Sequence, residues 1–333
     1  MALYDEEVNM GKTVAGALNE FMQNFVNLNP SRMKIAKTSM ENLFENISSP
    51  DDVFFDVYVE KNIQFGSFAR KTKIQPIDDI DIMICLKADG STYSDNNGVI
   101  EITVNNYNSV QNNCCFNENQ LNSTKVINQF IKKLKTFSDY KKAELHKKGE
   151  SATLQLASYE WNFDIVPCFF TVPENNGRTY YIIPDGNGYW KKTDPRIDRD
   201  IIFDLDKRLG GFVLDPIRLI KYWNRRPTMP SMPSYTLESL LVQYFQAQKK
   251  IASTDLCCHF RDCLAYIYKN VYNEIIDLKG IQGDLNKLEK IERDKIANRA
   301  FEDCNKINKI IKNPDLCFPL LIEIFGKEFP CKD

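Results

Sequence analysis

FGSFARKTKIQPIDDIDIMI, residues 65–84, is the stretch that decides the fold of this chain. It joins a Gly66-Ser67 turn and a basic stretch to two carboxylates, Asp79 and Asp81, on an apolar strand. Because successive strand side chains point to opposite faces, Asp79 and Asp81 share a face, and Asp78 on the other face is not expected to be a ligand. Two neighbouring carboxylates repel each other unless a cation lies between them, so the pair predicts a site for hard divalent cations.

A third carboxylate, Asp164, lies in the apolar stretch Trp161–Pro167, which we expect to form a neighbouring strand. An acid between apolar residues costs several kcal/mol unless it is paired, and a bound metal ion supplies such a partner. Two ions about 4 Å apart can activate an attacking hydroxyl and stabilise a leaving pyrophosphate. We therefore predict that Asp79, Asp81 and Asp164 are catalytic residues that hold two Mg²⁺ (or Mn²⁺) ions. The alternative is that the DDID sequence is an acidic strand end that faces solvent.

The Gly66-Ser67 pair predicts a turn that binds phosphate. Glycine lets the backbone approach a phosphate group closely, and Ser67 adds a hydroxyl donor. The residues that follow can open a short helix, whose N-terminal N–H groups attract anions. The alternative is an ordinary turn, because a Gly-Ser pair by itself is weak evidence.

The composition sets limits on the class of protein. The chain has 333 residues, of which 43% are hydrophobic, and this is enough for two domains with sizeable cores. Its net charge of −2 provides no global basic field, so we expect a small nucleotide substrate and no stable binding of long nucleic acid. No run approaches the about 18 apolar residues of a membrane span, and residues 1–7 lack the apolar segment of a signal peptide. We therefore predict a cytoplasmic protein without a membrane partner, whose ten cysteines are reduced.

The rest of the chain predicts an α+β protein, in which strands dominate the first half and helices dominate from about residue 198. The predicted helices cover 11–48 with a break at Pro30, 123–137, a segment from Asp215-Pro216 to Arg226, and a segment from Ser234 onward. Asp215 is the expected N-cap of its helix, with Pro216 in the first helical position. The predicted strands cover 53–64, 79–86, 99–104, 152–158 and 161–170.

These motifs resemble the DNA polymerase β-like nucleotidyltransferase superfamily, whose pattern is an apolar residue, Gly-Ser, a spacer, Asp-x-Asp and a third Asp on a later strand. The closer resemblance is to the bacterial cyclic-oligonucleotide synthases of anti-phage (CBASS) systems. It rests on the sequence GSFARKT before the acid pair and on the sequence FDIVPCF around Asp164. These synthases are relatives of cyclic GMP-AMP synthase and of the 2′-5′ oligoadenylate synthetases. The likeness covers roughly residues 50–245.

The helical half shares in this resemblance. Ile220–Asn224 is similar to the family helix whose lysine holds the donor triphosphate, which implies that role for Lys221. Ser234–Glu238 is similar to the start of the following helix, which implies that Ser234 touches the triphosphate and that Tyr235 stacks on a base. Each residue taken singly also has a structural explanation: a lysine at a helix edge, a helix N-cap and a core aromatic.

The resemblance implies a polymerase β-like nucleotidyltransferase domain with a mixed sheet over residues 1–193, including the N-terminal helix. A C-terminal helical-bundle domain follows over 194–333, and the nucleotide lies between the two. The implied function is the metal-dependent joining of ribonucleoside triphosphates into a cyclic di- or trinucleotide second messenger, with release of pyrophosphate, in anti-phage defence. ATP and/or GTP are the implied substrates, and pyrimidine nucleotides stay open.

The resemblance also implies a protein partner from the same defence operon, either regulatory or belonging to a ubiquitin-like conjugation system. The alternative function is that of another polymerase β-like nucleotidyltransferase, one that modifies RNA ends or a hydroxyl of a small molecule or protein. A zinc site at Cys257, Cys258, His259 and Cys263 stays open. Their spacing is unlike the paired ligands of zinc sites, and the segment also fits an amphipathic helix, which we favour.

Overall fold

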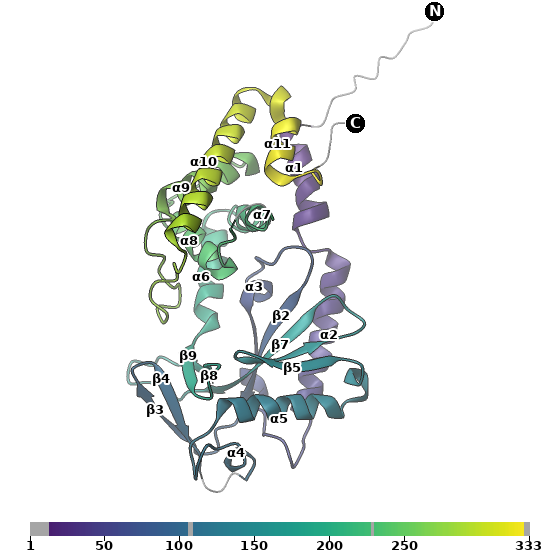
Figure 1. Ribbon diagram of the computed structural model, residues 1–333, viewed down its shortest axis with the longest axis vertical. Coiled ribbons are helices and arrows are strands. Elements are labelled where there is room, and N and C mark those ends of the chain that lie inside the picture. The colour runs from purple at the N-terminus through teal and green to yellow at the C-terminus, as the bar shows by residue number, and fades with distance from the viewer. Residues whose placement is uncertain (1–12, 106–108, 228–229, 330–333) are drawn as a thin grey trace, which may run out of the picture. The chain divides into compact units, whose positions relative to one another are not determined.

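The computed structural model describes residues 13–105, 109–227 and 230–329, and Figure 1 shows its elements along the chain. By their contacts these residues divide into two units. The sheet unit comprises residues 28–203 and 278–281, and the helical unit comprises the described residues up to Asn27 together with 204–277 and 282–329. Residues 1–7, for which no signal peptide was predicted, lie outside the described residues.

The two predicted N-terminal helices belong to different units. The helix α1 (Val14–Phe21) and the π-helical turn η1 (Met22–Val26) belong to the helical unit, whereas α2 (Pro30–Ser48) belongs to the sheet unit. The break at Pro30 is confirmed: Pro30 is the first residue of α2, and the Asn29 side chain accepts a hydrogen bond from the Ser31 N–H at 2.9 Å. The domain boundary after residue 193 stays a prediction.

Nine strands of the described residues form the mixed sheet of the sheet unit, in the order β1-β2-β7-β8-β9-β4-β3, with β6 also paired to β7 and β5 paired to β6. The strands are β1 (Ile63–Phe65), β2 (Asp79–Leu86), β3 (Thr92–Asn96), β4 (Val99–Thr103), β5 (Glu144–Lys148), β6 (Ser151–Gln155), β7 (Asn162–Phe170), β8 (Tyr181–Pro184) and β9 (Trp190–Thr193). The pair β2–β7 is parallel and all the other pairs are antiparallel. The strands predicted over 79–86 and 161–170 are therefore confirmed, and they are direct neighbours.

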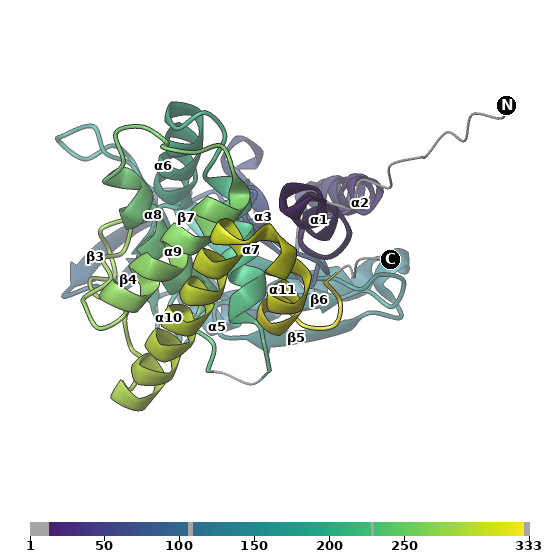
Figure 2. The same cartoon turned by 90° about the horizontal axis from the view of Figure 1, so that it is seen from above.

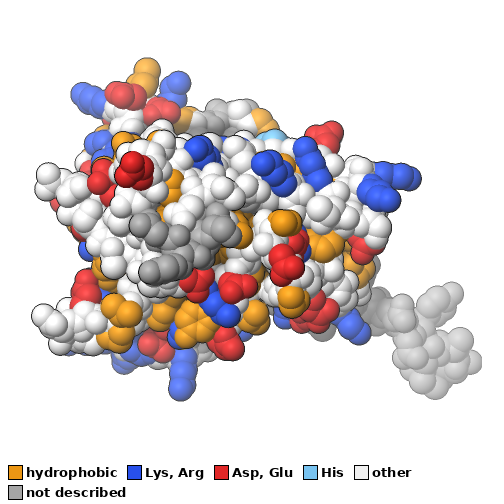
Figure 3. Space-filling model, turned by 90° about the horizontal axis from the view of Figure 1, so that it is seen from below, with side chains coloured by type: hydrophobic (Ala, Val, Ile, Leu, Met, Phe, Trp, Pro, Cys, Tyr) orange, Lys and Arg blue, Asp and Glu red, His pale blue; other side chains and the backbone are white. Residues whose placement is uncertain are grey.

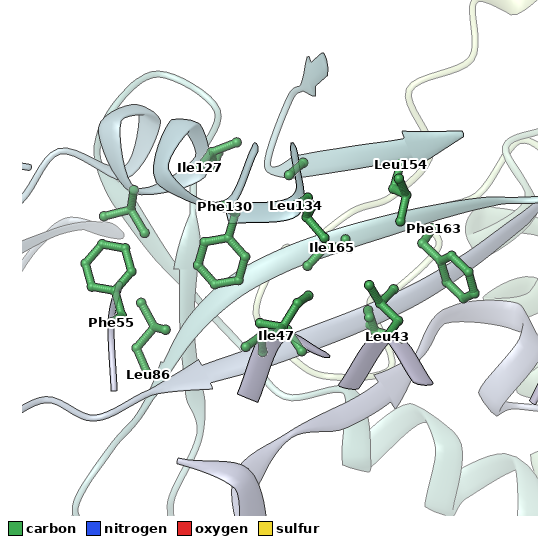
Figure 4. Close-up of a cluster of buried hydrophobic side chains, with 14 of the residues drawn as sticks. Leu43, Ile47, Phe55, Leu86, Ile127, Phe130, Leu134, Leu154, Phe163 and Ile165 are labelled. Atoms are coloured by element: carbon green, nitrogen blue, oxygen red, sulfur yellow. The ribbon is translucent and has the colours of Figure 1, made fainter. Parts of the chain in front are cut away.

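One face of this sheet is covered by α2 and by α5 (Ser123–Thr136). Figure 4 shows the core beneath them: Leu43 and Ile47 of α2 and Phe130 and Leu134 of α5 pack against Phe163 and Ile165 of β7. Ile80 and Ile82 of β2 belong to the same core and are fully buried. Burying this face on two helices leaves the opposite face of β2 and β7, on which the acidic residues lie, for the site.

The strand predicted over 53–64 is largely wrong. In its place lie a 3₁₀ turn η2 (Val59–Lys61) and the short β1, with one isolated bridge between Val57 and Leu86. The apolar residues that suggested a strand fill the core instead, because the Phe54 ring packs on the Phe130 ring with a centroid distance of 5.0 Å. The sheet unit is completed by α3 (Gly66–Ala69), α4 (Ser109–Asn112), the 3₁₀ turn η3 (Ser138–Tyr140) and the first part of α6 (Pro195–Arg208).

The helical unit contains α7 (Leu214–Asn224), α8 (Ser234–Gln246), α9 (Leu256–Asn270), α10 (Lys290–Lys312), the 3₁₀ turn η4 (Pro314–Leu316) and α11 (Cys317–Phe325). Figure 2 shows α9 and α10 running side by side, in agreement with their contacts. An aromatic cluster joins α1 to the rest of the unit, because the Phe21 ring lies 5.0 Å from the rings of Tyr222, Phe325 and Phe329. This cluster explains why the contacts assign α1 to the helical unit.

The predicted start of α7 and its predicted N-cap each lie two residues too far along the chain. The helix begins at Leu214, with Val213 in the cap position and no side-chain cap of its own. The Asp206 carboxylate accepts hydrogen bonds from the N–H groups of Val213 (3.0 Å) and Leu214 (3.3 Å). An acceptor from an earlier part of the chain thus satisfies the first N–H groups, and Asp215 pairs with Arg218 instead.

No helix among the described residues is long and apolar enough to cross a membrane. Figure 3 shows one face of the molecule, on which acidic and basic side chains are interspersed. This distribution agrees with the net charge of −2, and the face shown carries no single-sign field.

Candidate active site

The three predicted acids converge on the face of β2 and β7 that lies opposite the core under α2 and α5, and each of them is partly buried. In the parallel register Asp81 lies opposite Asp164, and Asp79 lies opposite Asn162. One carboxylate oxygen from each of Asp79, Asp81 and Asp164 lies within 4.8 Å of the other two. Among the described residues, no other set of three or more His, Cys, Asp or Glu side chains brings its ligand atoms this close together. Their common face follows from the two-residue period of the strands, as the sequence predicts.

Gly66 lies directly against Asp81. The strand β1 pairs antiparallel with β2 so that Phe65 is opposite Asp81, and the chain then turns sharply at Gly66, whose φ is +69°. A Cβ atom at position 66 would lie 1.9 Å from Asp81 Oδ2. Both the left-handed backbone conformation and the close approach therefore require glycine.

Backbone hydrogen bonds close the turn that follows Gly66. The Ser67 carbonyl accepts hydrogen bonds from the N–H groups of Thr72 and Lys73, both at 3.0 Å. The Arg70 guanidinium donates to Asp198 Oδ2 at 3.0 Å, and both of these side chains are buried. The segment between the glycine and the acid pair is thus held by backbone hydrogen bonds and by a buried ion pair.

Asp164 is held by a hydroxyl and approached by an exposed cation. The Thr153 hydroxyl, from the antiparallel position opposite Asp164, donates to Asp164 Oδ1 at 2.6 Å. Lys148 Nζ lies 3.8 Å from Asp164 Oδ2, but its side chain is 69% exposed and its charge is screened by water. Sequence reasoning missed Thr153, and the alternation along residues 151–155 together with a hairpin pairing to the Asp164 strand is the signal that could have found it.

The electrostatics of the cluster favour an added cation. Burial raises the pKa of the Asp81 carboxyl, and the negative charge of Asp164 raises it further, to about 6. Lys73, Arg70 and Lys148 act in the opposite direction without cancelling the effect. The three carboxylates offer the hard oxygen donors that Mg²⁺ and Mn²⁺ prefer. The space beside Asp81 is open because residue 66 is a glycine, and a Cβ atom there would fill it.

The three residues assigned to nucleotide binding in the helical half lie on α7 and α8 of the helical unit. Lys221 Nζ pairs with Glu238 Oε1 at 2.6 Å, and both side chains are buried. The Tyr235 hydroxyl donates to Asp277 Oδ1 at 2.7 Å, and Ser234 is the exposed first residue of α8. Sequence reasoning missed Glu238 and Asp277, and the roles of Lys221, Ser234 and Tyr235 stay predictions.

The cysteines and histidine of the candidate zinc site lie on the helix α9. Cys257, His259 and Cys263 are buried in the helix packing, Cys258 is only partly buried, and their ligand atoms form no converging group. The His259 ring stacks on Phe212 with a centroid distance of 5.7 Å. The amphipathic helix predicted for this segment is confirmed as α9.

Comparison with known proteins agrees with this geometry. The model of the Second Messenger Oligonucleotide or Dinucleotide Synthetase (SMODS) domain matches residues 12–103, which include Gly66, Asp79 and Asp81. A probable cyclic nucleotide synthase of Bacillus cereus (strain VD146) is 37% identical over 330 residues, which are 96% of this chain and 99% of that protein.

Solved structures show the same fold. The CdnC protein of Escherichia coli MS115-1, solved with ATP, superposes with a TM-score of 0.67 at 15% identity over 95% of this chain and 98% of that one. The same protein in a complex with HORMA-deltaN superposes with a TM-score of 0.67 at 16% identity and the same coverage. The full-length relationship to the Bacillus cereus protein, together with the polymerase β-like fold around the acids, shows that this chain belongs to the bacterial cyclic-oligonucleotide synthases and is a nucleotidyltransferase.

Proposed function

We propose that this enzyme joins ribonucleoside triphosphates into a cyclic di- or trinucleotide with release of pyrophosphate, at a divalent-cation site formed by Asp79, Asp81 and Asp164. The observation that carries the proposal is the convergence of these three carboxylates, within 4.8 Å, beside a glycine that leaves no room for a side chain. The name of the Bacillus cereus relative supports the cyclic nature of the product.

The chain's own residues divide the work. Bound Mg²⁺ or Mn²⁺ supplies the positive charge that a triphosphate and a developing oxyanion require. Asp79 and Asp81 hold the cations on one strand, and Asp164 joins them from the neighbouring strand. Asp164, oriented by the Thr153 hydroxyl, receives the proton of the 2′ or 3′ hydroxyl as that oxygen attacks the α-phosphorus and pyrophosphate leaves.

The remaining roles come from the family resemblance. Gly66 and Ser67 bind the triphosphate through the backbone and a hydroxyl, Lys221 and Ser234 contact the donor triphosphate, and Tyr235 stacks on a base. The substrates include ATP, since the similar CdnC fold was solved with ATP. A regulatory protein partner in anti-phage defence is part of the proposal, and the CdnC complex with HORMA-deltaN supports it.

The test uses the purified full-length chain with the four ribonucleoside triphosphates, Mg²⁺ or Mn²⁺, and no added acceptor. We expect a phosphatase-resistant product and free pyrophosphate, which chromatography and mass spectrometry identify. Asp79→Asn should abolish product, a loss of at least about a thousandfold, because the variant removes a ligand of the cations that stabilise the developing charge. Asp78→Asn is the matched control, because Asp78 is the adjacent carboxylate outside the converging group, and it should change the rate less than about threefold.

The outcomes separate the alternatives. Equal losses in the Asp79→Asn and Asp78→Asn variants would contradict the assignment of the strand face. Product that appears only when RNA, a small molecule or a protein is added as acceptor would instead establish a transferase of the alternative class. If partner-free enzyme is silent, the assay is repeated with the proteins encoded beside it, because the proposal includes a regulatory partner.

A further inference from the structure

The ammonium group of Lys73 lies inside the acidic cluster. It forms ion pairs with the carboxylates of both Asp78 and Asp79, while only 6% of the Lys73 side chain is exposed. A buried ammonium is costly unless it is paired, so Lys73 and Asp79 neutralise each other in the folded protein. The side chains of Asp78 and Asp79 are 56% and 41% exposed, so solvent reaches the two carboxylates while the Lys73 ammonium stays buried.

The backbone fixes Lys73 in this place. Its N–H donates to the Ser67 carbonyl at 3.0 Å, within the turn that begins at Gly66. The flanking Ile74 and Ile77 are buried at 0% and 3% exposure and anchor the segment on the core side. The ammonium therefore belongs to the same rigid turn that brings Gly66 against Asp81.

The other cations near the acids differ from Lys73 in their contacts. Arg70 is engaged with the buried Asp198, and Lys148 is a surface side chain 3.8 Å from Asp164. Lys73 alone among these three both contacts an acid of the converging group at ion-pair distance and is shielded from water. A shielded charge interacts more strongly than an exposed one, because water and salt screen the latter.

We propose that Lys73 is a positioning residue that serves as the built-in counter-ion of the acids and competes with the divalent cation for Asp79. This proposal rests on the proposed function, since it takes Asp79 to be a metal ligand. An ammonium and a divalent cation repel each other and both bind the Asp79 carboxylate, so cation binding must loosen the ion pair between Lys73 and Asp79. Without a metal ion, Lys73 thereby neutralises part of the negative charge of the acids, and it lowers the affinity of the site for the divalent cation.

The experiment measures metal binding, which does not depend on catalysis. Mn²⁺ is titrated into the full chain without nucleotide, and free Mn²⁺ is followed by electron paramagnetic resonance. Lys73→Met should bind Mn²⁺ about tenfold more tightly, while its metal-free melting temperature falls by a few degrees because the acids lose their counter-ion. Lys148→Met is the matched control and should shift the affinity less than about twofold, because its charge is exposed.

A second variant keeps the test decisive if Lys73→Met does not fold. Lys73→Arg retains the charge and can bind a carboxylate through two hydrogen bonds, so its Mn²⁺ affinity should equal that of the wild type or be weaker. Unchanged or weaker binding by Lys73→Met, or tighter binding by Lys73→Arg, would overturn the counter-ion role. If the wild type does not bind Mn²⁺, or if Asp81→Asn binds it equally well, the proposed metal site itself is wrong, a result distinct from failure of the Lys73 role alone.

Discussion

The candidate functional residues are held in place in different ways in the sheet unit and in the helical unit. In the sheet unit the backbone fixes the site, because the register of β2 and β7 places Asp81 opposite Asp164 and Gly66, with a positive φ, lies directly against Asp81. In the helical unit side chains hold one another: Glu238 binds Lys221 and Asp277 binds Tyr235. Each of these two acids is at most 2% exposed.

This difference predicts different responses to mutation. A site fixed by the backbone tolerates no added atoms but needs few supporting side chains. A site held by buried side-chain pairs depends on both partners, because removing one partner leaves a buried polar group with fewer hydrogen bonds. The predictions below test this contrast in order of decreasing effect.

Among the changes that test this contrast, Gly66→Ala in the sheet unit is expected to have the largest effect. The new Cβ would meet Asp81 Oδ2 at 1.9 Å in a conformation with φ of +69°, so Asp81 must move. We expect nucleotidyl transfer to fall at least about a hundredfold, since a small misplacement of reacting groups has effects of this size. The measurement is the rate of pyrophosphate release.

Gly98→Ala is the matched control for that change. Gly98 also has a positive φ, +90°, but an added Cβ meets nothing within 4 Å. Its backbone strain should reduce stability by about 1 kcal/mol while activity stays near that of the wild type. Equal loss of activity in both variants would show that backbone strain, and not the contact with Asp81, explains the Gly66 result.

The convergence of Asp79, Asp81 and Asp164 could be predicted from the sequence because it depends on local periodicity. Asp79 and Asp81 lie on an apolar strand of alternating faces, and Asp164 lies on a second such strand, so their common face follows from residue spacing. Which lysine of the basic stretch turns inward was not predictable, because the placement of Lys73 depends on two hydrogen bonds to the Ser67 carbonyl. The long strand predicted before Gly66 was wrong because Phe54 and Phe55 fill the core without pairing in the sheet.

The supporting acids of the helical unit were missed for a physical reason. Glu238 is 17 residues from Lys221, and Asp277 is 42 residues from Tyr235. Such pairs form only through the packing of helices and loops, which no local pattern in the sequence encodes. The cap of α7 is a further case, because Asp206 supplies it from the end of the preceding helix.

An intermediate effect is expected from pH on the sheet unit's site. The folded protein raises the pKa of Asp81 from 3.8 to about 6, so at pH 5 only about one molecule in ten carries the ionised Asp81 that a cation requires. Mn²⁺ binding should therefore weaken about tenfold between pH 7 and pH 5. Titrations across this range measure the change, and a flat profile would contradict the raised pKa of Asp81 that its burial and the charge of Asp164 cause.

The same shift has a consequence for the stability of the metal-free protein. Since the folded state raises the pKa of Asp81 above its unfolded value, this group's stabilising contribution is complete below pH 3.8 and is lost as the pH rises through about 6. Asp81→Asn removes the titrating group and serves as the control, because the part of the pH dependence that belongs to Asp81 should disappear in this variant. Saturating Mn²⁺ should restore the stability of the wild type above pH 6 but not that of the variant.

The smallest effect is expected from Tyr235→Phe in the helical unit. The variant loses a 2.7 Å hydrogen bond to the buried Asp277, which should reduce stability by about 1–2 kcal/mol. Tyr272→Phe is the matched control, because its hydroxyl bonds Asp294 at 2.8 Å on an exposed surface, where the loss should be within about 0.5 kcal/mol. Because phenylalanine keeps the ring, the KM for nucleotide should change less than about threefold, whereas Tyr235→Ala should raise it at least about fivefold through lost stacking. If the KM stays constant in both variants while stability falls, Tyr235 only supports the helical unit, and the contrast between the two units becomes one between a catalytic site and a scaffold.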